Sequence, residues 1–354
     1  MSRTASGTVP RETAAGSGTN SRSTLSPITG QYQPDTEYRA LNTGQSQPGT
    51  EHRAPNTGQY QPDTALVAER TVGKLIAGII DLLTRADVPN PRREAVDLVA
   101  AVLDVPRLWP ALQHQRQVEP EIASRILLAA KQRAAGAPFA YAVGRAAFRH
   151  LNLHVDDRVL IPRQETEMLV EAVLQRTNGD GGLAVDIGTG SGAIALALAS
   201  EGRFDQVIGT DISAGALAVA RANALRLASS LNAPIEFRHG AFLAPVADLR
   251  ARVIVSNPPY ISSSEAVALP ASVRDWEPPV ALFSGLDGMV ATARIIRGSA
   301  HILEPLGLLA MEVDSRRAAL AARIAADTKY YHDIAILPDL TGRDRILLAT
   351  RTDR

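Results

Sequence analysis

From about residue 180 onward, the 354-residue chain alternates short aliphatic segments with helical ones. The segments that resemble strands are LAVDI, QVIGTD, IEFRHG, VIVSN, LGLLAMEV, HDIAIL and RILLATR. Repeated β-α units of this kind predict a mostly parallel sheet covered on both faces, with ligands beyond the carboxyl ends of its strands. Only residues 338–344 join the last two segments, which indicates a hairpin and hence one antiparallel strand among seven.

The chain ahead of this sheet begins with a repetitive stretch. Residues 1–64 contain a 14-residue repeat that starts at Thr29, Thr43 and Thr57 and includes few apolar residues. Such a stretch cannot bury enough surface to offset its ordering entropy, so we predict a disordered tail. A transit peptide or a binding tail is the alternative interpretation.

Two further parts precede the sheet domain, which we assign to residues 168–354. Residues 65–137 carry aliphatic side chains at helical spacing, and a start at Asn90 and Pro91 and an end near Gly136 delimit two of the helices. This pattern predicts a small helical domain. Residues 138–167 form a linker in which residues 148–161 alternate around Asp156 and Asp157, and this indicates a β-hairpin.

Composition excludes several classes of function. Lys and Arg balance Asp and Glu, and there is no cysteine. A neutral chain does not favour a polyanionic partner, so we expect no stable nucleic-acid binding. Disulfides and thiolate metal sites are excluded, and we expect no metal. No apolar run spans a bilayer and no secretory signal is present, so we expect a cytoplasmic protein that does not enter a membrane.

A glycine loop follows the first strand of the sheet and opens a helix. It consists of Gly188, Thr189, Gly190, Ser191 and Gly192, and Asp186 precedes it. Glycines allow positive φ and close approach of a ligand to free N–H groups at a helix start. The spacing is G-x-G-x-G, with Ala193 where a dinucleotide fold has its third glycine, which favours S-adenosylmethionine over NAD. Asp211, at the end of the next strand, can accept hydrogen bonds from both hydroxyls of a ribose in either cofactor.

The fourth strand ends abruptly in Asn257, Pro258, Pro259 and Tyr260. The prolines have no N–H for a strand ladder, so the strand stops beside the glycine loop. The Asn257 side-chain oxygen and the Pro258 carbonyl can accept both N–H bonds of a planar NH₂ group, and Tyr260 offers it a flat face. We call residues 257–260 the clamp and predict that it aims an amide or base nitrogen at a methyl donor. No His or carboxylate adjoins the clamp in sequence, and we expect that no base is needed.

With these motifs, the chain resembles the glutamine N5-methyltransferases of peptide-chain release factors, from about Ala65 to Arg351. The segment L-I-P-R-Q-E-T-E at residues 160–167 is similar to the family's L-I-P-R-P-[ED]-T-E. Further similar segments lie around Pro138 and Phe148, from Glu277 to Gly288, and from Asp339 to Arg345.

The resemblance implies a class I S-adenosylmethionine-dependent methyltransferase fold and a helical domain that helps to hold the release factor. It also implies that the glutamine of a Gly-Gly-Gln loop of class I release factors enters the clamp, that residues 188–192 hold the methionine part of the cofactor, and that Asp211 holds the ribose. Phe242 would then lie at the adenine edge, and Asn257 would touch both cofactor and glutamine. Thr166 and Glu167 would close over the cofactor, and we expect a monomer.

Four positions depart from the family pattern: Gln164 replaces a proline, Ala241 and Arg252 each replace an acid, and Asp314 replaces a glycine. None lies in the clamp, so methyl transfer remains the prediction, although loss of the acid at position 241 weakens the case for adenine recognition. Two alternatives stay open at this stage. One is an amino-methyltransferase of nucleic-acid bases, and the other is a cofactor-binding protein without catalysis.

Overall fold

The structure is a computed structural model, and it describes residues 71–177 and 181–353. The predicted disordered tail and the first residues of the predicted helical domain lie outside the described residues. Among the described helices, none is long and apolar enough to cross a lipid bilayer.

The amino-terminal part of the described chain is helical. Its elements are α3 (Val72–Arg85), α4 (Pro91–Leu103), α5 (Trp109–Leu112) and α6 (Pro120–Ala134). The Thr71 hydroxyl caps α3, and Pro91 occupies the first turn of α4, where its missing N–H has no intrahelical role. Apolar side chains of these helices, among them Ile79, Leu98 and Ile126, form one hydrophobic cluster. The predicted helix start at Asn90 and helix end near Gly136 are confirmed.

A short helix, α7 (Phe139–Val143), leads into a hairpin of β1 (Arg145–Phe148) and β2 (Leu151–His154). The predicted hairpin exists, but its predicted turn was wrong. Phe148 pairs with Leu151, so the turn is made by residues 149 and 150 and not by Asp156 and Asp157. Arg149 has a φ of 52°, the left-handed conformation that a tight turn requires. Its guanidinium is bound by Glu171 and Glu201, which offsets the strain.

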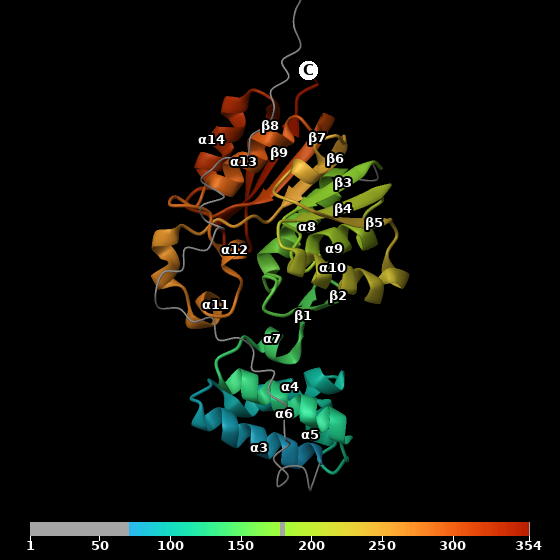
Figure 1. Ribbon diagram of the computed structural model, residues 1–354, viewed down its shortest axis with the longest axis vertical. Helices are drawn as coiled ribbons and strands as arrows, with labels where there is room; N and C mark the ends of the chain where they lie inside the picture. The colour runs from blue at the N-terminus through green and yellow to red at the C-terminus, as the bar shows by residue number, and fades with distance from the viewer. Residues whose placement is uncertain (1–70, 178–180, 354) are drawn as a thin grey trace, which may run out of the picture. The chain divides into compact units, whose positions relative to one another are not determined.

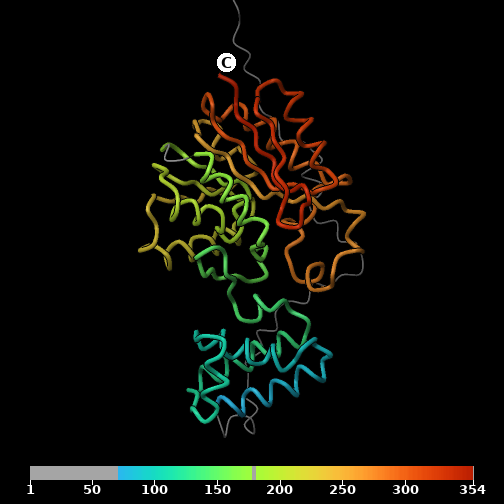
Figure 2. Tube along the Cα trace, turned by 180° about the vertical axis from the view of Figure 1, so that it is seen from behind, coloured from blue at the N-terminus to red at the C-terminus, as the bar shows by residue number. Residues whose placement is uncertain are grey.

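The carboxyl-terminal part contains a seven-stranded sheet in the order β5-β4-β3-β6-β7-β9-β8. The strands are β3 (Leu183–Ile187), β4 (Gln206–Asp211), β5 (Ile235–His239), β6 (Ala251–Ser256), β7 (Leu303–Glu312), β8 (Tyr331–Pro338) and β9 (Asp344–Arg351). The last strand, β9, runs antiparallel to both of its neighbours, and the other pairs are parallel. Figure 2 shows β8 and β9 in red at one edge of this sheet. The predicted fold class, with one antiparallel strand among seven, is confirmed.

Helices cover both faces of the sheet (Figure 1). Alternate residues of each strand point to opposite faces, as in β3, where Ala184 joins one hydrophobic cluster and Val185 and Ile187 join the other. The first cluster includes the hairpin, α8 (Gln164–Thr177) and α9 (Ala193–Glu201). The second includes α13 (Val290–Ser299) and α14 (Ala318–Thr328). Helix α10 (Ala214–Arg226) lies against β4 and β5.

The remaining elements are single turns in connections. They are η1 (Ala228–Ser230), η2 (Ala244–Val246), η3 (Ser263–Ala268), α11 (Ala271–Arg274) and α12 (Pro279–Leu282). The last three follow the clamp and belong to the long connection from β6 to α13. That connection therefore starts at the edge of the sheet where the predicted site lies.

Candidate active site

The glycine loop and the clamp begin at the carboxyl ends of adjacent strands. In the register of β3 with β6, Ile187 lies opposite Ser256, and the Ser256 hydroxyl donates to the Ile187 carbonyl over 2.7 Å. On the other side of β3, Ile187 lies opposite Thr210 of β4. The prediction that the clamp lies beside the glycine loop is therefore confirmed.

The glycine loop has the backbone conformation that its sequence predicts. Gly188, Gly190 and Gly192 have φ values of 74°, 54° and 84°. A Cβ added to Gly188 or Gly190 would meet nothing within 4 Å, whereas one added to Gly192 would come within 3.0 Å of the Leu196 side chain. The first two glycines thus border open space, and the third lets the loop pack against α9. This is the arrangement of a backbone cradle with room for a ligand.

A buried carboxylate, that of Asp186, holds the glycine loop by hydrogen bonds. Asp186 is fully buried, and its Oδ2 atom accepts hydrogen bonds from the Thr189 hydroxyl (2.6 Å) and the Ala195 amide (3.2 Å). Its Oδ1 atom has no partner among the described residues. Burial raises the pKa of Asp186 to about 7, even though the two hydrogen bonds act in the opposite direction. A buried acceptor without a partner is costly, so this oxygen is a natural place for a ligand donor.

Asp211, at the end of β4, is hydrogen-bonded to the glycine loop. One of its oxygens accepts from the Gly190 amide (2.9 Å) and the other from the Ser213 amide (2.8 Å). Burial raises the pKa of Asp211, and the amide hydrogen bonds from Ser213 and Gly190 counteract that shift. A carboxylate has about four lone-pair positions, so both oxygens keep capacity for further donors.

Phe242 lies beyond β5, and its φ is 50°. The Arg294 guanidinium stands over its ring, 5.2 Å from the centroid, and the Thr210 hydroxyl donates to its carbonyl over 3.3 Å. Phe242 packs against the cluster that holds α13 and α14. The position beside it that an acid occupies in the family pattern is Ala241, so its side chain offers no acceptor here.

The clamp is held in place by the connection that follows it. The Ile261 amide donates to the Leu282 carbonyl, and the Ser284 amide donates to the Ile261 carbonyl. Gly288 has a φ of 76° and lies so near the clamp that an added Cβ would be 2.4 Å from the Tyr260 carbonyl oxygen. Only glycine fits at this position, which explains why the segment from Glu277 to Gly288 ends in a glycine.

Two side chains from distant parts of the sequence, those of Thr166 and Glu312, form hydrogen bonds with members of the clamp. The Asn257 Nδ2 atom donates to the Thr166 hydroxyl (2.9 Å), and that hydroxyl donates to Glu312 Oε2 (2.6 Å). The Tyr260 hydroxyl donates to Glu312 Oε1 (3.3 Å). We call these four residues the polar chain. Burial raises the pKa of Glu312, while the Thr166 hydroxyl and the Arg345 charge lower it.

Sequence reasoning missed Glu312 as a functional candidate. Its signal was an acid at the carboxyl end of the aliphatic strand β7, at the same sheet edge as Asp186, Asp211 and Asn257. Glu167, expected to close over the cofactor, accepts a hydrogen bond from the Arg149 amide in the hairpin turn (2.9 Å). Its carboxylate is thus engaged with the hairpin, whereas Thr166 contacts the clamp.

Three of the four departures from the family pattern lie outside the glycine loop and the clamp, whereas Ala241 directly precedes Phe242. Gln164 is exposed at the first residue of α8. Arg252 lies at the start of β6, the end of the strand opposite the clamp, and donates to the Leu306 carbonyl. Asp314 pairs with Arg316 and Arg317.

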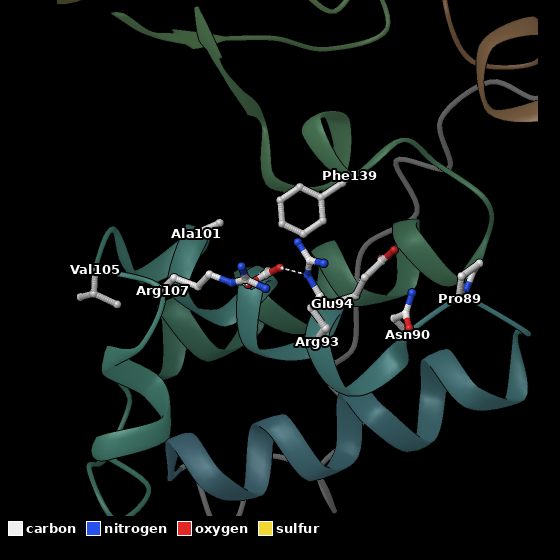
Figure 3. A pocket seen from close by; sticks show the side chains of 10 residues that line it. Pro89, Asn90, Arg93, Glu94, Ala101, Val105, Arg107 and Phe139 are labelled. Atoms are coloured by element: carbon white, nitrogen blue, oxygen red, sulfur yellow. Dashed lines mark hydrogen bonds and ion pairs between the residues drawn. The ribbon is translucent and has the colours of Figure 1, made fainter. Parts of the chain in front are cut away.

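A pocket of about 540 Å³ opens in the helical part of the protein. In Figure 3 the ring of Phe139 lies across from the side chains of Arg93 and Glu94. The pocket also includes Asp97 and Arg107, which form an ion pair with an N–O distance of 2.5 Å. It therefore offers an aromatic face beside charges of both signs.

Comparison with known proteins matches both parts of the chain. The family described as "PrmC N-terminal domain" matches residues 74–144, and "Methyltransferase small domain" matches residues 163–271. A protein from Moorella thermoacetica is 40% identical over 80% of this chain and 99% of its own length. Proteins from Rhodopirellula baltica (35% identity, 78% of this chain, 95% of the relative) and Xylella fastidiosa strain 9a5c (39%, 75% and 96%) are also similar. All three carry the name release factor glutamine methyltransferase.

Proposed function

Because the chain belongs to the family of release factor glutamine methyltransferases, we propose that it methylates a glutamine of peptide-chain release factors. The methyl group comes from S-adenosylmethionine and goes to the side-chain amide N5 of the glutamine in the Gly-Gly-Gln motif. The observation that carries this proposal is the register of β3 with β6, which sets a backbone cradle beside a clamp for an NH₂ group.

The glycine loop fits the cofactor. Open space beside Gly188 and Gly190 leaves room for the methionine part, and Thr189, Ser191 and Gly192 complete the cradle. The unpartnered Oδ1 atom of Asp186 lies beneath the loop as an acceptor for a cofactor donor. Asp211 keeps lone pairs for the ribose hydroxyls, and Phe242 borders the adenine. When bound, S-adenosylmethionine supplies an activated methyl group on a sulfonium.

The clamp positions the acceptor nitrogen. An amide nitrogen is a poor nucleophile because its lone pair is delocalised into the carbonyl. The Asn257 side-chain oxygen and the Pro258 carbonyl accept its two N–H bonds, which aim the nitrogen and return electron density to it. Pro259 stiffens the backbone, and Tyr260 lies against the amide plane. The proton that leaves after transfer goes to water or to the clamp. Glu312 accepts hydrogen bonds from Thr166 and Tyr260, and we assign it no role as a base.

We further propose that the helical domain, residues 65–137, contacts the release factor through the pocket that its Arg93 forms together with Phe139 at the start of the linker. The pocket offers aromatic and charged groups that a folded protein surface can match. Class I release factors are soluble translation factors, so we propose that the enzyme acts in the cytoplasm. The equal numbers of acidic and basic residues give the chain no net positive charge, which supports the absence of stable nucleic-acid binding.

The proposal is tested by following labelled methyl groups. The protein is incubated with methyl-labelled S-adenosylmethionine and either a class I release factor, RNA or DNA. We expect label in the release factor alone, and tandem mass spectrometry should place one methyl on the Gly-Gly-Gln glutamine. A release factor with asparagine in place of that glutamine is the matched control and should stay unlabelled. Label in RNA or DNA, or in no acceptor, would contradict the proposal.

A further inference from the structure

The polar chain behind the clamp links three parts of the fold. Thr166 lies on α8, Asn257 follows β6, and Glu312 ends β7, so the hydrogen bonds cross sequence separations of 91 and 146 residues. Thr166 is 4% exposed and Glu312 is 2% exposed. Hydrogen bonds in such a dry environment are strong, and a member left without its partner is costly.

The number of available protons sets the direction of each hydrogen bond in the polar chain. An ionised carboxylate only accepts, so the single hydroxyl proton of Thr166 goes to Glu312. The Thr166 oxygen can then act only as an acceptor toward Asn257. The amide of Asn257 must therefore present its NH₂ group to Thr166, and its Oδ1 atom is turned to the other side.

This orientation is the one that methyl transfer needs. If the amide were rotated by 180°, its NH₂ group would face the NH₂ group of the incoming glutamine, and donor would meet donor. We infer that Thr166 and Glu312 are positioning residues, which hold the Asn257 amide with Oδ1 toward the acceptor nitrogen. Glu312 also anchors the Tyr260 hydroxyl, so one carboxylate holds two members of the clamp. The inference rests on the proposed function, since it concerns the same transfer.

The test compares threonine variants at two positions on α8. Thr166→Val keeps the shape of the side chain but removes the hydroxyl, so Asn257 loses the acceptor that fixes its amide. We expect kcat for release-factor methylation to fall about tenfold, the size of one modest hydrogen bond, while the KM for release factor and the Kd for S-adenosylmethionine stay within about twofold. Thr166→Ser keeps the hydroxyl and should restore most of the rate.

Thr177→Val is the matched control. Thr177 is also a buried threonine of α8, but its hydroxyl donates to the Val173 carbonyl and lies away from the clamp. This variant should lose similar thermal stability and keep its kcat. If Thr166→Val loses no more activity than Thr177→Val, or if Thr166→Ser is as poor as Thr166→Val, the inference is overturned.

The pH dependence of activity is a second measurement, and it would not change if Thr166 and Glu312 had a purely structural role. When Glu312 takes up a proton, the oxygen that carries the proton becomes a donor, and the hydrogen bond that this oxygen accepts from Thr166 or from Tyr260 is disturbed. Burial raises the pKa of Glu312, the charge of Arg345 lowers it, and the charge of Glu165 raises it. We therefore expect activity to fall on acidification at a pH above the range in which a carboxyl group usually titrates. Because Asp186 and Asp211 also have raised pKa values, the profile is measured as kcat at saturating S-adenosylmethionine. The acid limb should then be weaker in Glu312→Gln than in the wild type, and identical limbs in the two proteins would contradict the inference.

The outcomes separate the two proposals. If the wild-type protein does not methylate release factor, the proposed function fails and the inference falls with it. If the wild type methylates the glutamine but Thr166→Val turns over at the same rate, the function stands and the positioning role is wrong.

Discussion

The glycine loop after β3 and the clamp after β6 end neighbouring strands, yet they are built differently. The loop uses backbone, since positive φ angles at Gly188 and Gly190 leave open space, and hydrogen bonds to Thr210 and Asp211 hold the amides of these two glycines. The clamp uses side chains, and its amide depends on Thr166 and Glu312 from other elements. A backbone cradle is sensitive to any added Cβ. A side-chain clamp is sensitive to single hydrogen bonds at residues far away in the sequence.

The largest effect should come from filling the cradle. In Gly190→Val, a β-branched side chain must adopt a φ near 54° and occupies the open space, so we expect S-adenosylmethionine binding to be abolished in calorimetry. Gly342→Val is the matched control, since Gly342 has a φ of 80° and equally open surroundings in the β8–β9 turn. It should suffer similar backbone strain and still bind the cofactor. Equal affinity in the wild type and Gly190→Val would show that the loop is no cofactor site.

A smaller effect, on turnover and not on cofactor binding, is expected at Gly288, which lies against the Tyr260 carbonyl of the clamp. A methyl group in Gly288→Ala would come within 2.4 Å of the Tyr260 carbonyl oxygen and must displace it. We expect kcat to fall about tenfold, equivalent to about 1.4 kcal/mol, while cofactor affinity in calorimetry stays unchanged. If cofactor affinity falls as much as kcat, the two halves of the site are not separable in the way described here.

The next prediction is on stability rather than on binding or turnover, and it concerns Asp186. Its pKa is about 7 in the folded protein and 3.8 as a free side chain. The folded state therefore binds the proton more tightly, and the cofactor-free protein should lose stability as the pH rises from about 4 to about 7. Asp186→Asn removes this contribution, so its thermal midpoint should vary less with pH over that range than that of the wild type. Parallel midpoint curves for the two proteins would mean that Asp186 does not carry the buried charge.

Much of this architecture could be predicted from the sequence because its signals are local. Alternating β and α segments indicated the sheet, and the short link at residues 338–344 indicated the antiparallel strand. Residues 188–192 and the clamp were recognisable because each motif is continuous in the chain. The hairpin turn was placed wrongly because Asp156 and Asp157 have typical turn composition, whereas the real turn relies on Arg149 and its distant partners Glu171 and Glu201.

Glu312 was missed for a related reason. An acid at the end of an aliphatic strand has many roles, and only the fold brings it to Thr166, 146 residues earlier in the chain. The hydrogen bond from Asn257 to Thr166 also depends on the packing of α8 at the sheet edge. Pairwise contacts of this kind leave no trace in spacing or periodicity.

The most direct test of the clamp is the rate of a single turnover in Asn257→Ala, with release-factor affinity measured in parallel. The substitution removes the acceptor that aims the glutamine nitrogen but keeps most of the peptide-binding surface. Loss of one aimed hydrogen bond at a reacting centre costs roughly 10²- to 10³-fold in rate, or about 3 to 4 kcal/mol. We therefore expect the methylation rate to fall by at least this factor while release-factor affinity changes little. A rate near that of the wild type would show that residues 257–260 only end a strand, and would contradict the mechanism.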